Sequence, residues 1–228
     1  MLYTRQSALE NIRNREGKRV FYLGKGDQLT NDARDYLTRE RIPILPAEQA
    51  KPQGYQLQGG GTVTEKPEHM THLNAQVLVP KTHPRIAFRG SVDLLEAQLL
   101  LCQSLADEDF YKKLQEALDL ARMLIRCDVL EEPVPEMKLG GMDADALRKR
   151  SHLPQNFYGQ PHFMPDGKEK KLLLQINLAR AMARKTELKA VDAFSDREGI
   201  PTRPDILQAM NRLSSYLYIL MIELKAKS

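Results

Sequence analysis

The sequence predicts an all-α protein, a bundle of four or five helices with a small strand-helix-strand appendage at its N-terminus. Two patterns support this class. Four long segments place apolar residues at helical spacing, and only the region near the N-terminus reads as strands. The 228 residues are enough for one core of good size. The N-terminal unit is too short to make the whole fold α/β.

The appendage is predicted within residues 1–50, where the composition is typical of two strands that flank a helix. The predicted helix is preceded by side chains able to accept a hydrogen bond from its first backbone amides. The predicted elements are strands at residues 18–23 and 42–45 and a helix at residues 29–39, capped by Thr30 or Asn31.

A run of glycines marks the second predicted part of the chain, residues 51–80. Between about residues 46 and 66 the composition shifts to Pro, Gln and Gly, so regular structure is not expected there. A glycine run lets backbone amides approach a phosphate, although this run matches neither common phosphate-binding motif and an ordinary loop stays an alternative. The candidate nucleotide-binding residues are Gly60, Gly61 and Thr62.

Three histidines, His69, His72 and His83, lie close together in the sequence. The first two are spaced i,i+3, which makes them candidate metal ligands. No cysteine is nearby, and no carboxylate lies at a recognised ligand spacing. The pattern therefore predicts no metal site, and the three histidines are kept only as candidates.

The bundle is predicted over residues 81–228. Its last helix begins with Pro204, which suits the first turn of a helix. Asp93 is expected in the first turn of the first helix, where a carboxylate suits the helix dipole. Many Pro and Gly residues predict an irregular connection over residues 131–167, with one short helix at residues 143–150. The four long predicted helices are residues 91–105, 110–129, 168–194 and 204–227.

Two of these helices have a clear apolar face at i,i+3 and i,i+4 spacing, which predicts the side chains of the core. In the second helix they are Phe110, Leu114, Ala117, Ala121, Leu124 and Ile125, and in the fourth they are Ile206, Leu213, Leu217, Leu220 and Leu224.

The third predicted helix is apolar nearly all the way round over residues 172–187, and its exceptions carry charge. At 3.6 residues per turn, Arg180, Arg184 and Glu187 fall on one stripe. We therefore expect this stripe to line a cleft or a subunit contact. A solvated face with an Arg184/Glu187 pair, worth only about 0.2–0.5 kcal/mol, is the alternative. The side chains predicted to reach the core from the opposite face are Leu174, Leu178, Ala181 and Met182.

Charge and cysteine content argue against several classes. The 34 basic and 30 acidic residues are mixed along the chain, so a nucleic-acid interface is not expected. Cys102 and Cys127 belong to no Cys/His cluster, which predicts reduced thiols and no disulfide. The N-terminus lacks the apolar core of a signal peptide, and no apolar run is long enough to span a bilayer. We therefore expect a cytoplasmic protein.

Four stretches of the bundle stand out as motifs. They are KTHPRIAFRGSVDLL at residues 81–95, FMPDG at 163–167, ARAMARKTE at 179–187 and MNRLSSYLYIL at 210–220. In the same order they are similar to K-x-[HS]-P-R-[IV]-x-x-x-G-x-x-D-x-L, F-x-x-P-G-G, A-R-x-x-x-R-R-x-E and L-N-R-L-S-D-Y-L-F-x-L. In this respect the chain resembles the ATP:corrinoid adenosyltransferases of the propanediol-utilisation type, and among them the ethanolamine-utilisation branch.

The resemblance implies a ferritin-like helical bundle that assembles as a homotrimer with active sites between subunits. It also implies transfer of the 5′-deoxyadenosyl group of ATP to cob(I)alamin, with release of triphosphate. ATP and cobalamin are then the substrates, and Mg²⁺ accompanies the nucleotide. The ethanolamine branch adds a corrinoid reductase, an adenosylcobalamin-dependent ammonia-lyase and a bacterial microcompartment as expected associations.

The resemblance implies nucleotide-binding roles for residues that occupy matching positions in these motifs. Arg184 and Lys185 resemble the clamp for the triphosphate, and Glu187 and Asn211 resemble the groups that hold nucleotide and metal. Lys81, which opens the first motif, is a further candidate for ATP binding.

Two other roles follow from the same resemblance. Arg180, also a candidate for ATP binding, resembles an arginine that pairs across the subunit boundary with the aspartate of the G-x-x-D motif, here Asp93. Phe163 resembles the aromatic residue that displaces the lower axial ligand of cobalamin, and Phe157 is a rival for that role.

The chain departs from the family patterns in several places. The usual ATP-binding T-x-x-G-D is absent, so the loop at residues 59–64 would have to take its place. Lys185 stands where a second arginine is usual, and Ser215 where an aspartate is usual. The metal-binding H-x(11)-C-C-x-x-C of some ethanolamine-branch members is missing.

Two alternatives to an adenosyltransferase stay open. One is a non-catalytic helical scaffold or a protein that only binds a corrinoid or a nucleotide. The other is a nucleotide hydrolase, which needs clustered carboxylates for several Mg²⁺ ions and is disfavoured because the charged stripe contains one carboxylate.

Overall fold

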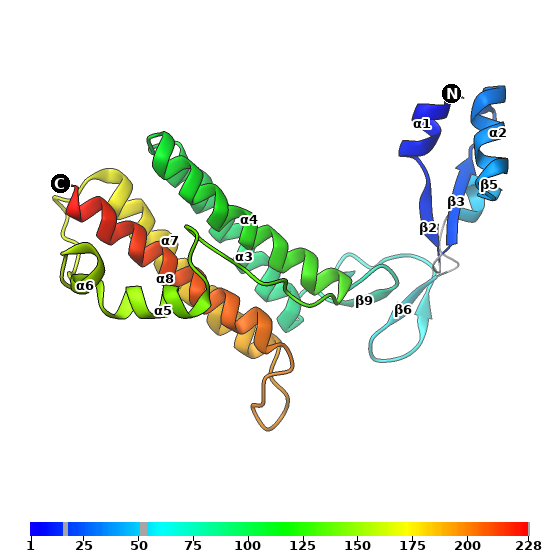
Figure 1. Ribbon diagram of the computed structural model, residues 1–228. Helices are drawn as coiled ribbons and strands as arrows, with labels where there is room; N and C mark the ends of the chain where they lie inside the picture. The colour runs from blue at the N-terminus through cyan, green and yellow to red at the C-terminus, as the bar shows by residue number, and fades with distance from the viewer. Residues whose placement is uncertain (16–17, 51–53, 228) are drawn as a thin grey trace. The chain divides into compact units, whose positions relative to one another are not determined.

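The computed structural model describes residues 1–15, 18–50 and 54–227. The chain forms two compact units, Met1–Pro67 and Glu68–Ser228. Their boundary falls inside residues 51–80, the part predicted to bind nucleotide. Figure 1 shows the elements of both units in chain order.

The first unit contains the predicted strand-helix-strand arrangement. β3 (Lys18–Leu23) pairs in parallel with β5 (Ile44–Pro46), and α2 (Asn31–Arg39) connects them. The Oγ1 atom of Thr30 accepts a hydrogen bond from the Ala33 amide at 3.3 Å, so Thr30 is the cap. The unit also contains β1 (Leu2–Tyr3), α1 (Arg5–Glu10), β2 (Arg13–Arg15), β4 (Gln28–Leu29) and the short helix η1 (Ala47–Ala50).

The expectation that residues 46–66 have no regular structure was wrong. β6 (Tyr55–Leu57) and β7 (Thr62–Val63) form an antiparallel hairpin. The glycine run makes its turn: φ is 96° at Gly60 and 87° at Gly61. Only glycine adopts these values at no steric cost, so the run is explained by the hairpin geometry itself. Residues 51–53 lie outside the described residues.

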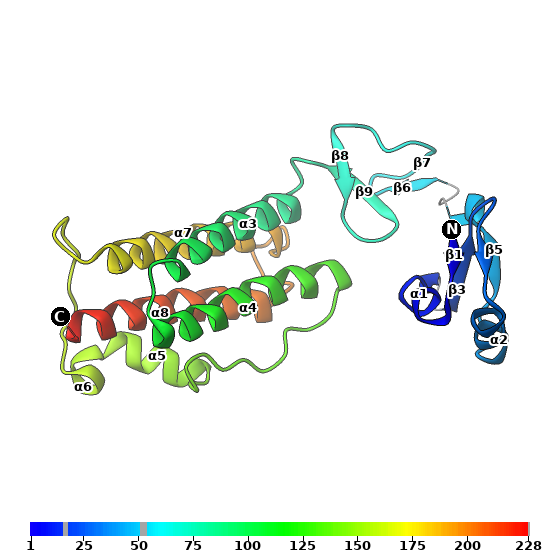
Figure 2. The ribbon, with the colours of Figure 1, turned by 90° about the horizontal axis from the view of Figure 1, so that it is seen from above.

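The second unit is the predicted bundle, preceded by a hairpin of β8 (Met70–His72) and β9 (Val77–Pro80). Four long helices form the bundle, and Figures 1 and 2 show them lying side by side. α7 packs against both α3 and α8, and α4 packs against α3. Two short helices, α5 (Ala144–His152) and α6 (Pro154–Tyr158), lie against α8. The long helices are α3 (Pro84–Gln103), α4 (Glu108–Leu130), α7 (Lys171–Ala193) and α8 (Pro204–Ala226).

The first bundle helix begins earlier than predicted, at Pro84 instead of residue 91. His83 caps it, because its Nδ1 atom accepts a hydrogen bond from the Arg85 amide at 3.2 Å, and Pro84 occupies the first turn. Asp93 consequently lies in the middle of α3. The expected interaction of its carboxylate with the helix dipole was wrong, since that interaction is confined to the first turn.

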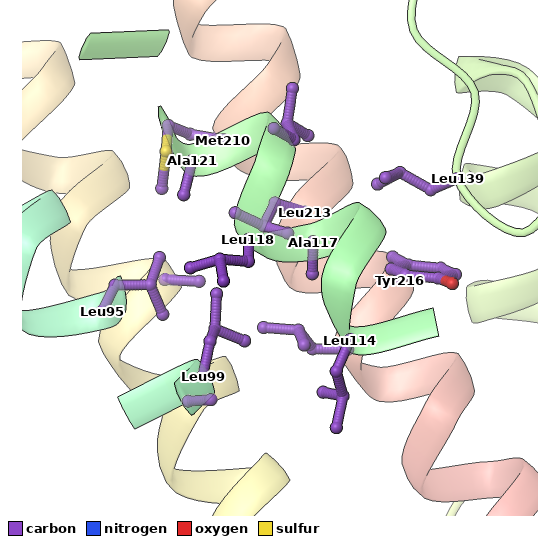
Figure 3. Packing of buried hydrophobic residues seen from close by; sticks show 14 of the residues in the cluster. Leu95, Leu99, Leu114, Ala117, Leu118, Ala121, Leu139, Met210, Leu213 and Tyr216 are labelled. Carbon is purple, nitrogen blue, oxygen red and sulfur yellow. The ribbon is translucent and has the colours of Figure 1, made fainter. Parts of the chain in front are cut away.

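The core lies where α3, α4 and α8 meet, and Figure 3 shows leucines from all three helices pointing toward one another. The predicted faces of α4 and α8 are buried, apart from Ile125, which is half-buried. Leu139, from the connection between α4 and α5, packs beside Tyr216 at the edge of this core. The periodicity therefore located the core correctly in the two helices with a clear apolar face.

The predicted core face of α7 was wrong at two of its four residues, whereas Met182 packs against the core and Leu174 is half-buried. Leu178 is 44% exposed and Ala181 is exposed, although both were predicted to reach the core. Small side chains dominate the face that packs against α3 and α8, and they let neighbouring helices approach closely. A helix that is apolar nearly all round has no single apolar face that must be buried. The neighbouring helices therefore determine which of its sides faces the core. The buried residues of α7 are Leu173, Ile176, Ala179, Ala183, Thr186 and Ala190.

A buried ion-pair network joins the start of α3 to the end of α4. The Asp128 carboxylate is fully buried and accepts hydrogen bonds from Arg85 Nε at 2.7 Å and Arg89 Nε at 2.5 Å. Arg89 also donates to the backbone carbonyls of His72 and Leu73. One buried carboxylate therefore pairs with two arginines, and Arg89 ties the β8–β9 hairpin to the bundle.

Both cysteines lie inside the bundle as free thiols. Burial raises the pKa of the Cys102 thiol to about 11, which makes it an inert packing residue. Among the described residues, no helix is both long enough and apolar enough to cross a membrane.

Candidate active site

The exposed side of the α7–α8 pair brings two of the motifs together. Asn211 Nδ2, on α8, donates a hydrogen bond to Glu187 Oε1, on α7, at 2.9 Å. Arg212 Nη1 donates to Asn211 Oδ1, so the amide is held from both ends. Residues far apart in the sequence thus form one polar cluster on neighbouring helices.

Arg180 is half-buried, one turn before Arg184 on α7. Its guanidinium donates to Asn177 Oδ1 at 3.0 Å and lies 5.9 Å from the centre of the Tyr218 ring. Burial and the nearby charge of Arg184 lower the pKa of Arg180. In the described part of the chain no carboxylate pairs with it, so its charge is available to a ligand or to a partner subunit.

Arg184 and Lys185 are both exposed. Within residues 1–15, 18–50 and 54–227, neither forms an ion pair, and the Arg184/Glu187 pair considered as an alternative is not formed. On α7, Arg180, Arg184 and Glu187 follow one another at i,i+4 and i,i+3 spacing and share one side of the helix, whereas Lys185 lies on a different side from Glu187. This arrangement suits a polyanion that carries its own divalent cation, because the cations attract phosphate oxygens and the carboxylate attracts the metal.

The loop that carries Phe163 is anchored next to this cluster. His162 Nε2 donates to the His152 carbonyl oxygen at 3.1 Å, which leaves Nδ1 to accept from the Tyr218 hydroxyl at 2.8 Å. Phe163 itself is half-buried against the bundle core, with Lys225 Nζ 5.8 Å from its ring centre. Tyr218 therefore connects the loop, through His162, to Arg180.

The rival aromatic, Phe157, lies in α6 and is 40% exposed. Lys149 and Arg150 of α5 approach its ring at 5.9 Å and 5.3 Å. Phe163 also has a cation near its ring, so these contacts do not distinguish the two aromatic residues, and the choice between them stays a prediction.

The remaining predicted nucleotide-binding residues are Lys81 and three residues of the glycine loop. Lys81 is exposed and pairs with Glu68 at 3.1 Å. Gly60, Gly61 and Thr62 belong to the first unit, in the β6–β7 hairpin. Their role in binding nucleotide stays a prediction.

Asp93 is exposed on α3 and, in the described chain, has no ion-pair partner, so it does not contact Arg180 within one subunit. Two hydrogen-bonded pairs, Ser91 with Thr186 and Gln98 with Gln175, show that α3 and α7 run antiparallel. Asp93 and Arg180 therefore lie within the same stretch of the α3/α7 pair.

The three histidines have separate environments. His69 and His72 are exposed near the β8–β9 hairpin, whereas His83 caps α3. Burial and the charges of Arg85 and Arg89 lower the pKa of His83. Among the described residues, no three His, Cys, Asp or Glu side chains gather closely enough to hold a metal ion.

Sequence reasoning missed three participants: Arg212, Tyr218 and His162 as partners of the site. Arg212 and Tyr218 lie in the same motif as Asn211, and His162 directly precedes Phe163. Adjacency to a predicted site residue was the available signal. The apolar periodicity of α8 gave no sign of a role for Arg212, because this residue falls at the margin of the buried face.

The fold and the cluster together define a helical-bundle protein with a cationic site suited to a polyphosphate. The profile of the cobalamin adenosyltransferase family matches residues 62–224, and the chain belongs to this family.

The relatives agree with this assignment. The chain is 34% identical over 165 residues to the corrinoid adenosyltransferase EutT of Salmonella typhimurium, which covers 72% of this chain and 62% of that protein. It is likewise 34% identical over 160 residues to EutT of Escherichia coli, covering 70% of this chain and 60% of the relative. The chain therefore spans less than two thirds of the length of these relatives.

A solved structure has the same fold. It is a variant PduO-type ATP:corrinoid adenosyltransferase from Lactobacillus reuteri, complexed with cobalamin and ATP. The TM-score is 0.55 at 18% identity, with 70% of this chain and 91% of that chain covered.

Proposed function

We propose that this protein transfers the 5′-deoxyadenosyl group of ATP to cob(I)alamin and releases triphosphate. The observation that carries the proposal is the Glu187–Asn211 hydrogen bond on the side of α7 that also carries Arg184. It joins two family motifs into one cluster with the charges that a bound triphosphate and its metal need. Family membership and the EutT relatives support the same activity.

The reaction needs little acid or base catalysis from the protein. Cobalt(I) donates an electron pair to the 5′ carbon, the cobalt–carbon bond forms, and the carbon–oxygen bond breaks with its electrons leaving on triphosphate. The protein must align the reactants and stabilise the charge that grows on the leaving group. We assign this role to Arg184 and Lys185, whose side chains are exposed and form no ion pair in the described chain.

Mg²⁺ fits the donor set at this site. Glu187 is half-buried and bonds to the neutral Asn211 amide, and no cation among the described residues forms an ion pair with its carboxylate. A carboxylate oxygen is the hard ligand that Mg²⁺ prefers, and bound Mg²⁺ would neutralise part of the triphosphate charge. Glu187 and Asn211 would hold this ion with its nucleotide.

The direct test is the absorbance change on mixing the protein with ATP, Mg²⁺ and chemically reduced cob(I)alamin. Formation of adenosylcobalamin, with triphosphate as the second product, is expected. A protein that binds neither ATP nor cobalamin would instead be the helical scaffold. Release of inorganic phosphate from ATP without corrinoid would indicate a nucleotide hydrolase.

A homotrimer with shared active sites is the proposed assembly. Both helices of the α3/α7 pair expose leucines that contact with another copy could bury, namely Leu94 and Leu101 on α3 and Leu178 and Leu188 on α7. Asp93 and Arg180 lie within the same stretch, each without an ionic partner in the described chain. We therefore pair Asp93 of one subunit with Arg180 of the next.

Asp93→Ala is expected to weaken assembly and activity together, because removing one partner of a buried ion pair costs about 3–5 kcal/mol. Sedimentation analysis measures the first effect and the cobalamin assay the second. Asp119→Ala is the matched control, since Asp119 is an exposed carboxylate on α4 whose recorded partner is Gln115. A fully active Asp93→Ala trimer would rule out the pairing.

Phe163 is proposed to displace the lower axial ligand of cobalamin, which makes cobalt(II) easier to reduce. Phe163→Ala is expected to lose most activity when cob(II)alamin must be reduced on the enzyme, and to keep much of it with preformed cob(I)alamin. Phe157→Ala is the control and should behave alike with both substrates. Equal losses for Phe163→Ala would indicate a structural role, and no loss would move the assignment to Phe157.

The setting of the reaction is proposed from the relatives. EutT similarity supports a role in ethanolamine utilisation, with a corrinoid reductase as electron source and an adenosylcobalamin-dependent ammonia-lyase as the consumer of the product. A cytoplasmic location beside a bacterial microcompartment fits this role. Co-purification of the product-bound protein with the lyase would test it.

A further inference from the structure

Arg212 is the least satisfied charged side chain in the described bundle. It is 8% exposed, and its Nε atom is buried without a hydrogen-bond partner. In the described part of the chain no carboxylate forms an ion pair with it. Burying an unpaired guanidinium is unfavourable, and an apolar side chain of similar volume would commonly stabilise the fold. Stability therefore does not explain this residue.

Its contact points toward the candidate active site. Arg212 Nη1 donates to Asn211 Oδ1, and Asn211 Nδ2 donates to Glu187 Oε1 at 2.9 Å. A guanidinium has only hydrogen-bond donors. The Asn211 amide must therefore turn its acceptor, Oδ1, toward Arg212. Arg212 thereby fixes which end of the amide faces Glu187.

The consequence concerns the Glu187 carboxylate. With Oε1 occupied by the Asn211 amide, Oε2 has no recorded partner in the described chain. A carboxylate held by one hydrogen bond presents its other oxygen in a fixed direction, as required of a ligand to a hard cation. Without Arg212 the Asn211 side chain loses one of its two anchors, and the carboxylate loses its orientation.

We infer that Arg212 is a positioning residue that holds Asn211 and Glu187 ready for Mg·ATP, an inference that rests on the proposed function. Arg212 acts from inside the bundle through Asn211, without touching the nucleotide. An apolar residue here would make the fold more stable, but Arg212 instead fixes the orientation of Asn211 and Glu187. Such a loss of stability is common at functional sites.

Arg212→Met tests the role, because methionine keeps much of the volume without the charge. Titration calorimetry with Mg·ATP is expected to show an affinity about 10–100-fold lower than wild type. The urea midpoint of the same variant is expected to be unchanged or higher. A merely structural arginine would give the opposite pair of results, a lower midpoint with unchanged affinity, and would overturn the inference.

A double-mutant cycle tests the route through Asn211. Asn211→Ala combined with Arg212→Met is expected to bind Mg·ATP no more weakly than Asn211→Ala alone, since the relay is already broken. Additive losses would overturn the relay. Arg126→Met, at an exposed arginine of α4 paired with Glu132, should leave the affinity unchanged.

The wild-type titration separates this inference from the proposed function. If wild type lacks affinity for Mg·ATP, the proposed function fails and the role of Arg212 fails with it. If wild type binds Mg·ATP and Arg212→Met binds equally well, only the role of Arg212 is overturned.

Discussion

Replacing Asp128 with asparagine is expected to lower the free energy of unfolding by about 3–5 kcal/mol. Asp128 is fully buried and pairs with both Arg85 and Arg89. Asparagine keeps an acceptor oxygen but no charge, so Arg89 would lose its carboxylate partner and Arg85 would keep only the exposed Glu131. Urea denaturation followed by helical circular dichroism measures the loss. The β8–β9 hairpin should loosen too, because Arg89 binds its carbonyls.

The matched control is Glu131→Gln. Glu131 approaches the same Arg85 at 3.4 Å, but its side chain is largely exposed. A solvent-exposed pair contributes less than about 1 kcal/mol, so this variant should unfold close to wild type. Equal effects of the two substitutions would show that burial of the Asp128 pair does not determine its contribution.

Arg184→Ala is expected to raise the KM for ATP, lower kcat and reduce kcat/KM by about 10²–10³-fold. The charge on the triphosphate increases as the carbon–oxygen bond breaks, so a cation beside it stabilises the transition state more than the ground state. Arg184 is exposed and forms no ion pair in the described chain, and its removal should leave stability unchanged. Steady-state kinetics with varied ATP and saturating cob(I)alamin measures the change.

Two variants complete this experiment. Arg184→Lys keeps the charge but loses the planar fork of donors, so an intermediate loss is expected. Lys189→Ala removes another exposed cation of α7, outside the motif, and should have kinetics close to wild type. Unchanged kinetics of Arg184→Ala would remove Arg184 from the site.

Local patterns were sufficient for most of the elements. The spacing of Leu114, Ala117 and Leu124 predicted both α4 and its buried face, because one side of that helix is consistently apolar. Thr30 and Pro204 marked helix starts correctly, since capping and proline geometry depend only on neighbouring residues. The start of α3 was missed because its cap, His83, is not among the usual capping residues.

The sequence by itself determined the helical class, the strand-helix-strand appendage and the motifs that identify the family, since each depends on residues close together in the chain. Only the tertiary structure decided which face of α7 is buried, because that helix offers apolar side chains on nearly every side. It also decided the Asp128 network and the Arg212–Asn211–Glu187 relay. These contacts join separate helices or depend on how a side chain is buried, and no local pattern encodes which groups meet when helices pack.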